Sequence, residues 1–301
     1  MTNFILIAFC ISVGFLFKKK KLVSQDAHKT INTWIIYVAL PAVSFKYLPH
    51  LNWSYDLLIP ALSPVLIFVT GIIFVHGFTT TLKLNKQEKG AMQLSAGLAN
   101  TSFVGFPLIL AYFSDKEIGI AVICDQMTFI LFSVFGIIIA IRSSDGANTD
   151  AKQVLRKLFT FPPLLGCVTA LLIPKETDLS AITPFFHTLA GTVAPLALFS
   201  IGLQLECKGR IEDIKKMIIV LSYKLFIAPA LVLAILLTFG IKGTVAKIAV
   251  FEAAMAVLLS LSILTDTYNL NPKGTNLLIG TSILFSFFTT WIWYQLITIF
   301  L

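Results

Sequence analysis

The sequence predicts an all-α polytopic membrane protein of ten transmembrane helices, and two observations predict this class. Of the 301 residues, 57% are hydrophobic and only 13% are charged, and the mean hydropathy is +0.88. A soluble domain carries about 25% charged residues, so this chain has too little charge to cover a soluble surface. The hydrophobic residues also fall in blocks of about 20, which is long enough to cross the bilayer as a helix.

Ten apolar segments account for the predicted number of helices. They cover residues 3–17, 30–48, 57–78, 90–113, 117–141, 156–174, 183–204, 217–239, 244–265 and 275–300. The first segment precedes its basic residues and lacks a small-residue cleavage site, unlike a signal peptide, so we expect it to be a retained span. The loops between the segments are too short to hold a soluble domain.

The distribution of basic residues predicts the orientation in the membrane. Seventeen of the 23 Lys and Arg residues lie in odd-numbered loops or at their edges, four lie in even-numbered loops or at their edges, and Lys46 and Lys224 lie inside segments. Basic loops stay in the cytoplasm, so both termini are predicted to face outside. The minimal loops favour a multi-pass protein of a bacterial inner (plasma) membrane. This topology explains the net charge of +8, so no nucleic-acid partner is expected.

An internal likeness predicts two inverted five-helix repeats. Segment two contains YVALPAV (37–43) and segment seven contains VAPLALF (193–199), each with a proline among small residues. Five spans that follow an outside N-terminus reverse the orientation of the next five, as in many secondary transporters. The first repeat is therefore placed at residues 1–150 and the second at residues 151–301.

Polar and helix-breaking residues interrupt the fourth segment at NTSFVGFP (100–107). Pro107 removes one backbone amide and suits the first turn of a helix, while Gly105 lowers the cost of leaving helical geometry. The segment is therefore predicted to break into two half-helices, the second beginning near Pro107. Asn100, Thr101 and Ser102 would line the break and offer hydrogen-bond donors to a carboxylate. The alternative is a proline-kinked helix whose polar groups bond to neighbouring helices.

Three polar residues inside other segments are candidates for ion coupling: Asp125 and Gln126 in segment five, and Glu252 in segment nine. A charge at the bilayer centre costs at least about 2.5–3.5 kcal/mol, so an ionisable residue there points to a function. The alternative is a structural carboxyl group that bonds to a neighbouring helix. Lys224 is expected to snorkel to the cytoplasmic face, and Lys46 to anchor at the outer interface.

Four stretches of the chain carry a resemblance to a known family. They are FKKKKLVSQDAHKTINTWIIYVALPAVSF, NTSFVGFP, VICDQMTF and VAPLALFSIGLQL. Together they resemble the auxin efflux carrier family, which includes plant hormone exporters and bacterial malate- or malonate-type permeases with a bile acid/sodium symporter-like fold. The resemblance implies a scaffold of segments one, two, six and seven, and a moving core of segments three to five and eight to ten. It also implies a substrate near two crossing broken helices, with Met255 and Ser260 in the second half of the site.

The ninth segment departs from the pattern of that family. The family often has a proline after Ala-Met at its second crossover, whereas FEAAMAVLLSLS (251–262) has Ala256 there and contains neither glycine nor proline. Two outcomes are open: Ala and Ser residues alone make the break, or the helix is merely bent.

The resemblance and the polar break imply a secondary active transporter of small organic anions, such as di- or monocarboxylates. It would work by alternating access, in an elevator-like motion. Its expected partners are the anion and the lipid bilayer, and a homodimer is left open. H⁺ or Na⁺ is considered as a coupling ion, and no other cofactor is expected. The sequence has no catalytic or metal-binding motif, so neither an enzyme nor a metal site is expected.

Three alternatives to this function differ in what they need. A membrane sensor or partner subunit would keep the carrier fold without turnover. A monovalent cation/proton antiporter would need a carboxylate at the crossover itself, where this chain has Asn100. An intramembrane enzyme would need a nucleophile or a metal cluster, which the sequence lacks.

Overall fold

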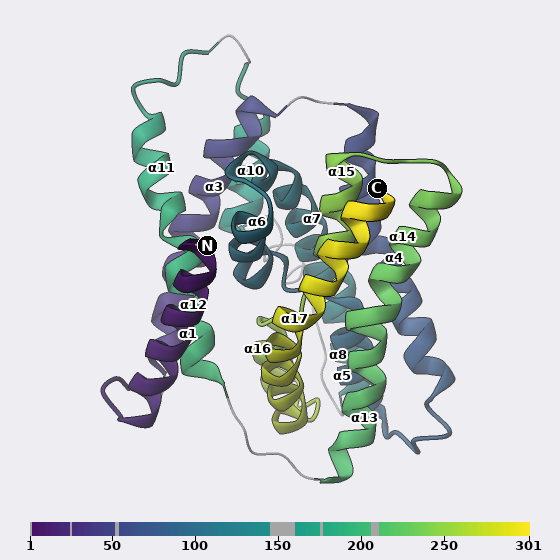
Figure 1. Cartoon of the computed structure of the whole chain (residues 1–301). Coiled ribbons are helices and arrows are strands. Elements are labelled where there is room, and N and C mark those ends of the chain that lie inside the picture. The colour runs from purple at the N-terminus through teal and green to yellow at the C-terminus, as the bar shows by residue number, and fades with distance from the viewer. Residues whose placement is uncertain (1, 25, 52–53, 145–159, 175–176, 206–210) are drawn as a thin grey trace. The chain divides into compact units, whose positions relative to one another are not determined.

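A computed structural model of the chain describes residues 2–24, 26–51, 54–144, 160–174, 177–205 and 211–301 (Figure 1). All regular structure within these ranges is helical, and no strand occurs there. Six helical stretches are long and apolar enough to cross a membrane: Thr2–Lys19, Tyr55–Gly77, Asp115–Ser143, Thr183–Gln204, Ile214–Thr238 and Pro272–Phe300. The predicted class of all-α membrane protein is therefore confirmed, while the count of ten spans stays a prediction.

The four remaining predicted segments differ from these six for reasons that their sequences explain. Segment two is a continuous helical run from Ala27 to Tyr47 that includes the charged Lys29 and Lys46. Segment six is described as Pro162–Leu171, because its predicted start at residue 156 lies outside the described residues. Segments four and nine each divide into two helices.

Internal contacts divide the chain into two compact units. Unit 1 comprises Met1–Ser54, Ser102–Val122 and Leu158–Leu205, and unit 2 comprises Tyr55–Thr101, Ile123–Lys157 and Glu206–Leu301. The predicted boundary between the repeats, at residues 150 and 151, lies outside the described part of the chain. The predicted scaffold and moving core concern motion, so that division stays a prediction.

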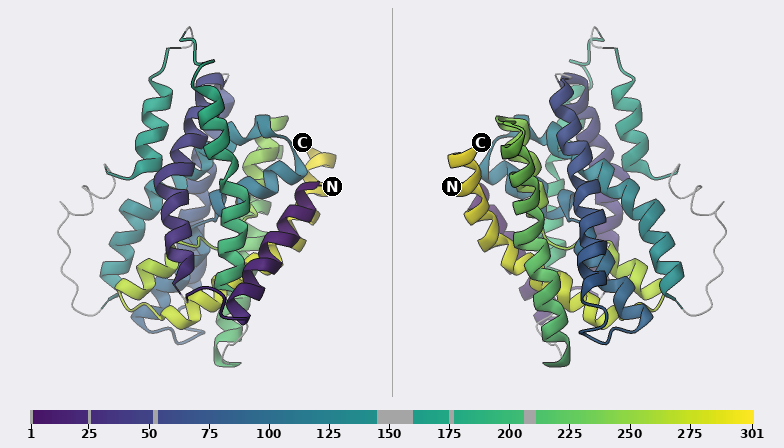
Figure 2. Two further views of the ribbon diagram at one scale, coloured as in Figure 1. Left: turned by 90° about the vertical axis from the view of Figure 1, so that its left-hand side faces the viewer. Right: turned by 90° about the vertical axis from the view of Figure 1, so that its right-hand side faces the viewer.

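Unit 1 is built around a close contact between its first and last helices. Its elements are α1 (Thr2–Lys19), α2 (Ala27–Trp34), η1 (Ile35–Ala39), α3 (Leu40–Tyr47), α6 (Phe106–Tyr112), α10 (Pro162–Leu171), α11 (Thr183–Gly191) and α12 (Val193–Gln204). Helix α1 lies along α12 (Figures 1 and 2). A Cβ atom on Gly202 would lie 2.3 Å from the carbonyl oxygen of Ile11, and one on Gly14 would lie 2.3 Å from that of Phe199. Small residues permit such an approach of membrane helices, which associate through van der Waals packing.

Gly202→Ala is expected to destabilise the protein by about 1–3 kcal/mol, because the added methyl group forces α1 and α12 apart. The midpoint of thermal unfolding in detergent measures the effect. Gly191→Ala, on α11 of the same unit, is the matched control, because no atom lies within 4 Å of its added Cβ. Equal midpoints for the two variants would contradict the contact.

Among the described residues, unit 2 contains more helical elements than unit 1. They are α4 (Leu58–Gly77), α5 (Lys86–Gly97), α7 (Ile118–Leu131, from Ile123 onward), η6 (Phe132–Gly136), α8 (Ile137–Ser143), α13 (Ile211–Ser222), η7 (Tyr223–Ile227), α14 (Ala228–Thr238), α15 (Thr244–Ala253), α16 (Leu261–Thr267) and α17 (Pro272–Phe300). A capping box starts α5: the Asn85 side chain accepts from the Glu88 amide, and the Glu88 carboxylate accepts from the Asn85 amide. At the other end of α5, a Cβ on Gly97 would lie 2.8 Å from the Phe68 ring. Glycine thus brings α4 against the end of α5, where segment four breaks.

Wide π-helical turns precede three prolines of the described chain. The turns and their prolines are η1 (Ile35–Ala39) with Pro41, η4 (Thr101–Gly105) with Pro107, and η7 (Tyr223–Ile227) with Pro229. Proline has no N–H to give to the carbonyl four residues earlier, and its ring clashes with that carbonyl, so the preceding turn widens. For Pro229 this carbonyl belongs to Leu225, and the Trp293 indole N–H donates to it at 2.7 Å. The prolines therefore widen these helices without ending them.

Candidate functional site

Segments four and nine both unwind, and their unwound stretches pair with each other. Helix α5 ends at Gly97 and α15 ends at Ala253, and a short antiparallel bridge joins Ala99 to Val257. The Asn100 amide donates to the Ala256 carbonyl at 2.9 Å, and the Leu258 amide donates to the Leu98 carbonyl at 3.2 Å. These bonds satisfy backbone groups that would otherwise be left unpaired inside a membrane.

The ninth segment is broken and not merely bent, although it contains neither glycine nor proline. In addition to the bridge, the Val257 amide donates to the Ser282 hydroxyl of α17 at 3.1 Å. The partners of the unwound backbone come from segment four and from α17. A local helix breaker is therefore unnecessary here.

The break in segment four lies earlier than Pro107 predicts. The chain is unwound over residues 98–100, and helical structure resumes with the wide turn η4 at Thr101. Pro107 stands in the first turn of α6, after that wide turn. The second half of the segment therefore begins with the wide turn η4, and its α-helix α6 begins at Phe106, next to Pro107 as expected. The pairing with segment nine, and not the proline, makes the break.

Asn100 is the most conspicuous polar group at the pairing. Its side chain is 0% exposed, and neither its amide nitrogen nor its amide oxygen has a hydrogen-bond partner among the described residues. Leaving a buried polar group unpaired costs about 1–3 kcal/mol. Its neighbour Thr101 is bonded, because its hydroxyl donates to the Asp125 carboxylate at 2.7 Å. The two adjacent residues therefore differ. The Thr101 hydroxyl is already bonded to a residue of α7, whereas the Asn100 amide is available to a ligand.

A small cavity lies beside this pairing, entirely within unit 2. Its volume is about 10 Å³, which is room for about one water molecule. It is lined by residues of α4, of segment four, of α7 and of α15: Ser63, Pro64, Ile67, Gly97, Ala99, Thr101, Cys124, Thr128, Glu252 and Ala253. Glu252 is 2% exposed, and neither of its carboxylate oxygens has a hydrogen-bond partner among the described residues. Asp125 follows the lining residue Cys124 in the chain and accepts from the lining residue Thr101, so it lies next to the cavity. The cavity is thus small and mostly apolar, and its polar lining consists of the Glu252 carboxylate and the side chains of Ser63, Thr101 and Thr128.

The predicted site residues fall into two groups. Asn100, Thr101, Asp125 and Glu252 come together at the pairing and the cavity. Gln126 and Met255 are buried and Ser260 is half-buried in unit 2, but none of the three lines the cavity. The other three predicted site residues lie in η4 and at the start of α6, in unit 1: Ser102, Gly105 and Pro107.

Sequence reasoning missed Ser63, Cys124 and Thr128 as lining residues. A signal for Ser63 exists, because it precedes Pro64 in the middle of an apolar segment, as the hydroxyls of segment four precede Pro107. Thr128 lies four residues after Cys124, so both side chains fall on one face of α7. Periodicity alone could not have selected that face as the one that meets Glu252.

The expectation that Lys224 snorkels to the surface is wrong. Lys224 is 0% exposed, and its Nζ has no hydrogen-bond partner among the described residues. The wide turn η7 and the helices packed around it enclose the side chain. The ammonium group therefore does not reach either face of unit 2.

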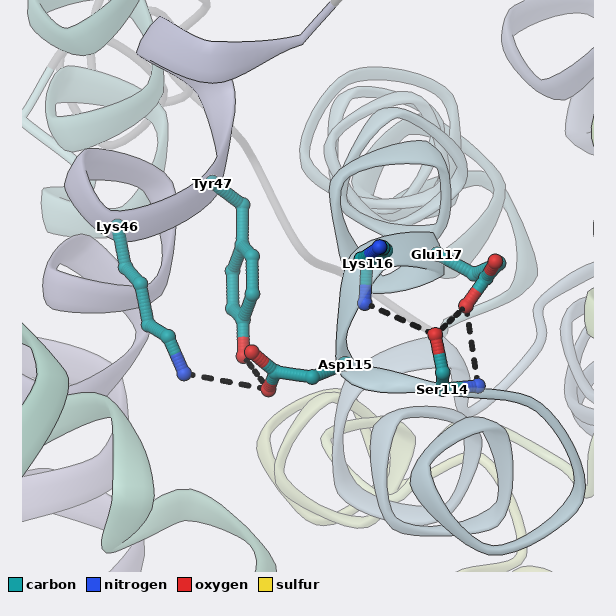
Figure 3. Close-up of polar contacts among 6 residues, drawn as sticks. All are labelled: Lys46, Tyr47, Ser114, Asp115, Lys116 and Glu117. Carbon is teal, nitrogen blue, oxygen red and sulfur yellow. Dashed lines mark hydrogen bonds and ion pairs between the residues drawn. The ribbon is translucent and has the colours of Figure 1, made fainter.

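Lys46 pairs with a turn of unit 1 (Figure 3). Its Nζ lies 3.2 Å from a carboxylate oxygen of Asp115, to which the Tyr47 hydroxyl also donates. Ser114 starts this turn as a cap: its hydroxyl accepts from the Lys116 amide, and the Glu117 carboxylate accepts from the Ser114 amide at 3.0 Å. Lys46 thus ties the end of α3 to the turn after α6, while its predicted anchoring at the membrane interface stays a prediction.

Comparison with known proteins adds to this geometry. The chain matches the membrane transport protein family over residues 1–294. An uncharacterized transporter of Methanocaldococcus jannaschii is 24% identical over 300 residues, which cover 96% of each chain. An uncharacterized transporter of Methanothermobacter thermautotrophicus is 22% identical over 249 residues, which cover 81% of this chain and 80% of that protein. The chain is therefore a multi-pass membrane transport protein, not an enzyme, and it belongs to the membrane transport protein family, that of the auxin efflux carriers.

Proposed function

We propose that the protein is a secondary active carrier of small organic anions, such as di- or monocarboxylates. The observation that carries this proposal is the fully buried Asn100 side chain, whose amide groups lack a partner among the described residues. It stands at the pairing of two broken helices, where a bound carboxylate can accept from its amide nitrogen. A ligand that bonds to Asn100 would offset the cost of burying it unpaired.

The proposed architecture has ten membrane helices in two inverted repeats that cross the inner membrane. Both termini lie on the side of this membrane that faces away from the cytoplasm. Two features support this architecture. The fourth and ninth segments, five segments apart, both break, and they pair in antiparallel fashion. An inverted repeat places broken helices at the repeat interface near the membrane midplane, where carriers bind substrate. Alternating access would follow from an elevator-like motion of a core with segments three to five and eight to ten.

We assign coupling to H⁺ or Na⁺ at the cavity that Glu252 lines, with Glu252 and the adjacent Asp125 as the ionisable groups. Carboxylate and hydroxyl oxygens suit a hard cation, and two neighbouring carboxylates favour sharing a proton or a cation. The cavity, with room for about one water molecule, is too small for an organic anion. The substrate would therefore bind at Asn100, together with Met255 and Ser260 of the same unit, and Gln126 would support the ion. Ser102, Gly105 and Pro107 stay proposed as further substrate-binding residues.

Uptake by proteoliposomes tests the proposal. Labelled malate is the probe, unlabelled mono- and dicarboxylates are competitors, and pH, Na⁺ or voltage gradients are imposed in turn. We expect saturable uptake that one of the gradients accelerates. If no carboxylate is moved and none competes, the organic-anion function is wrong.

A monovalent cation/proton antiporter is the second candidate, and the buried Glu252 carboxylate at the cavity favours it. Proteoliposomes that contain no organic anion distinguish the two functions. An antiporter exchanges Na⁺ for H⁺ in these vesicles, whereas the proposed carrier moves no cation until the anion is added.

A further inference from the structure

Lys224 is a fully buried lysine of unit 2 whose ammonium group has no recorded partner. It lies in the wide turn η7, is 0% exposed, and forms no hydrogen bond or ion pair within the described part of the chain. Burying a lone ammonium ion costs far more than burying a neutral group, so such a lysine becomes neutral or finds a counter-ion. Neither the cavity nor the pairing described above uses this residue.

The polar groups next to Lys224 are satisfied by other residues. The Leu225 carbonyl, freed by Pro229, accepts from Trp293 of α17 at 2.7 Å. The Tyr223 hydroxyl donates to the Ile67 carbonyl of α4 at 2.7 Å. The turn is therefore held by α4 and α17, and no bond of the turn itself needs the lysine amine.

No carboxylate among the described side chains compensates a charge on Lys224. The elements packed against η7 are α4, α5, α13, α14 and α17. Their titratable residues, with the one in η7 itself, are His76, Lys86, Glu88, Lys89, Glu212, Asp213, Lys215, Lys216, Tyr223, Lys273 and Tyr294. Glu88 pairs with Lys216. Asp213 precedes Lys224 by eleven residues, which is about 16 Å along a helix. A positive charge at Lys224 would therefore be unbalanced in this conformation.

One buried face of helix α17 contacts both the wide turn η7 and the break in segment nine. Ser282, Ser286 and Thr290 follow one another at intervals of four residues, and Trp293 continues the same face. Ser282 accepts from the Val257 amide at the break, and Trp293 donates to Leu225 beside Lys224. A rearrangement of the broken helices is thus mechanically connected to the turn that encloses the lysine.

We propose that Lys224 is a proton-carrying residue of unit 2, separate from the Asp125 and Glu252 cavity. The amine is neutral while η7 encloses it, and it binds one proton when a rearrangement of α17 and η7 admits water. Its protonated form adds one positive charge to unit 2 during part of the cycle. The role of this proton in transport rests on the proposed carrier function, whereas the neutrality of the enclosed amine does not.

Unfolding in detergent at different pH tests the neutrality directly. The folded amine is neutral, and the unfolded one is protonated below its usual pKa of about 10.4, so unfolding takes up a proton at Lys224 and the contribution of this residue to stability rises with pH. Lys224→Met removes this proton. Between pH 7 and 9 we expect the ratio of the wild-type unfolding constant to that of the variant to fall about tenfold per pH unit. Lys247→Met, on α15 of the same unit, is the control and should give a ratio that does not vary with pH.

A ratio that is independent of pH for Lys224→Met would overturn the proposal, because it would mean that the buried group stays charged. If this variant yields no folded protein, Lys224→Gln is measured in the same way. In proteoliposomes we expect Lys224→Met to lose the acceleration of uptake by a pH gradient and to keep exchange of anion for anion. Unchanged acceleration would overturn the transport role. If the wild-type protein moves no organic anion, the carrier function fails, and the unfolding experiment still decides the charge state of Lys224.

Discussion

Asn100→Ala is expected to lower the uptake of organic anion about 10- to 100-fold while leaving a folded protein. A hydrogen bond to a charged group contributes about 1.5–3 kcal/mol, which corresponds to this range of affinity. The Asn100 side chain has no hydrogen-bond partner among the described residues, so its removal breaks no such bond of the apo protein. The loss should therefore appear in the apparent affinity for substrate, and the unfolding midpoint should not fall.

Asn276→Ala is the matched control for this experiment. Asn276 also has an amide oxygen without a partner among the described residues, but it lies in the first turns of α17 and belongs neither to the lining of the cavity nor to the bridge between the broken helices. Uptake by this variant should equal that of the wild-type protein. Wild-type uptake by Asn100→Ala would mean that the pairing of the broken helices does not bind the anion, and the sensor or partner-subunit function would then gain support.

Glu252→Gln is expected to abolish gradient-driven accumulation and to preserve exchange of anion for anion. The amide has nearly the shape of the carboxylate, but it cannot carry a proton and it binds a cation weakly. Both oxygens of Glu252 are free of recorded partners, so the ionisable group is available to an ion. We expect the apparent affinity for the coupling ion to fall at least tenfold, about 1.4 kcal/mol. Uptake measured against the concentration of H⁺ or Na⁺, at fixed anion concentration, gives this value.

Glu117→Gln serves as the control for the loss of one carboxylate, because Glu117 lies in the exposed turn that Ser114 caps. It should accumulate the anion as the wild-type protein does. If Glu252→Gln also accumulates the anion normally, the cavity that Glu252 lines is not the coupling site. Asp125→Asn would extend the test, since an amide oxygen can still accept from Thr101.

The helical membrane class and several local features follow from the sequence because they depend on neighbouring residues. Composition and block length predict apolar helices whatever their packing. Pro41, Pro107 and Pro229 predict disturbed turns, since each lacks the N–H that the carbonyl four residues earlier needs. The sequence Asn85 to Glu88 predicts the start of α5 in the same way, because the capping box closes within four residues.

The position of the two breaks and the composition of the cavity depend on residues far apart in the chain. Segment nine has no helix breaker, and its backbone unwinds where Leu98, Asn100 and Ser282 supply hydrogen-bond partners. Lys224 also differs from what its position in the sequence predicts. A lysine near the end of an apolar segment ordinarily snorkels to the surface, whereas the packing of η7 buries this one. Neither outcome can be read from a local pattern.

By itself the sequence determined that this protein is an α-helical membrane protein of a transporter family with polar residues in its fourth segment. Those properties depend on the overall composition or on residues that lie close together in the chain, so they can be predicted without knowledge of the tertiary structure. Only the tertiary structure decided that segments four and nine pair, that Glu252 meets Ser63 and Thr128, and that Asn100 keeps its amide free. The physical reason is that hydrogen-bond satisfaction inside a membrane is settled between helices, and the partner of each buried group lies on another segment.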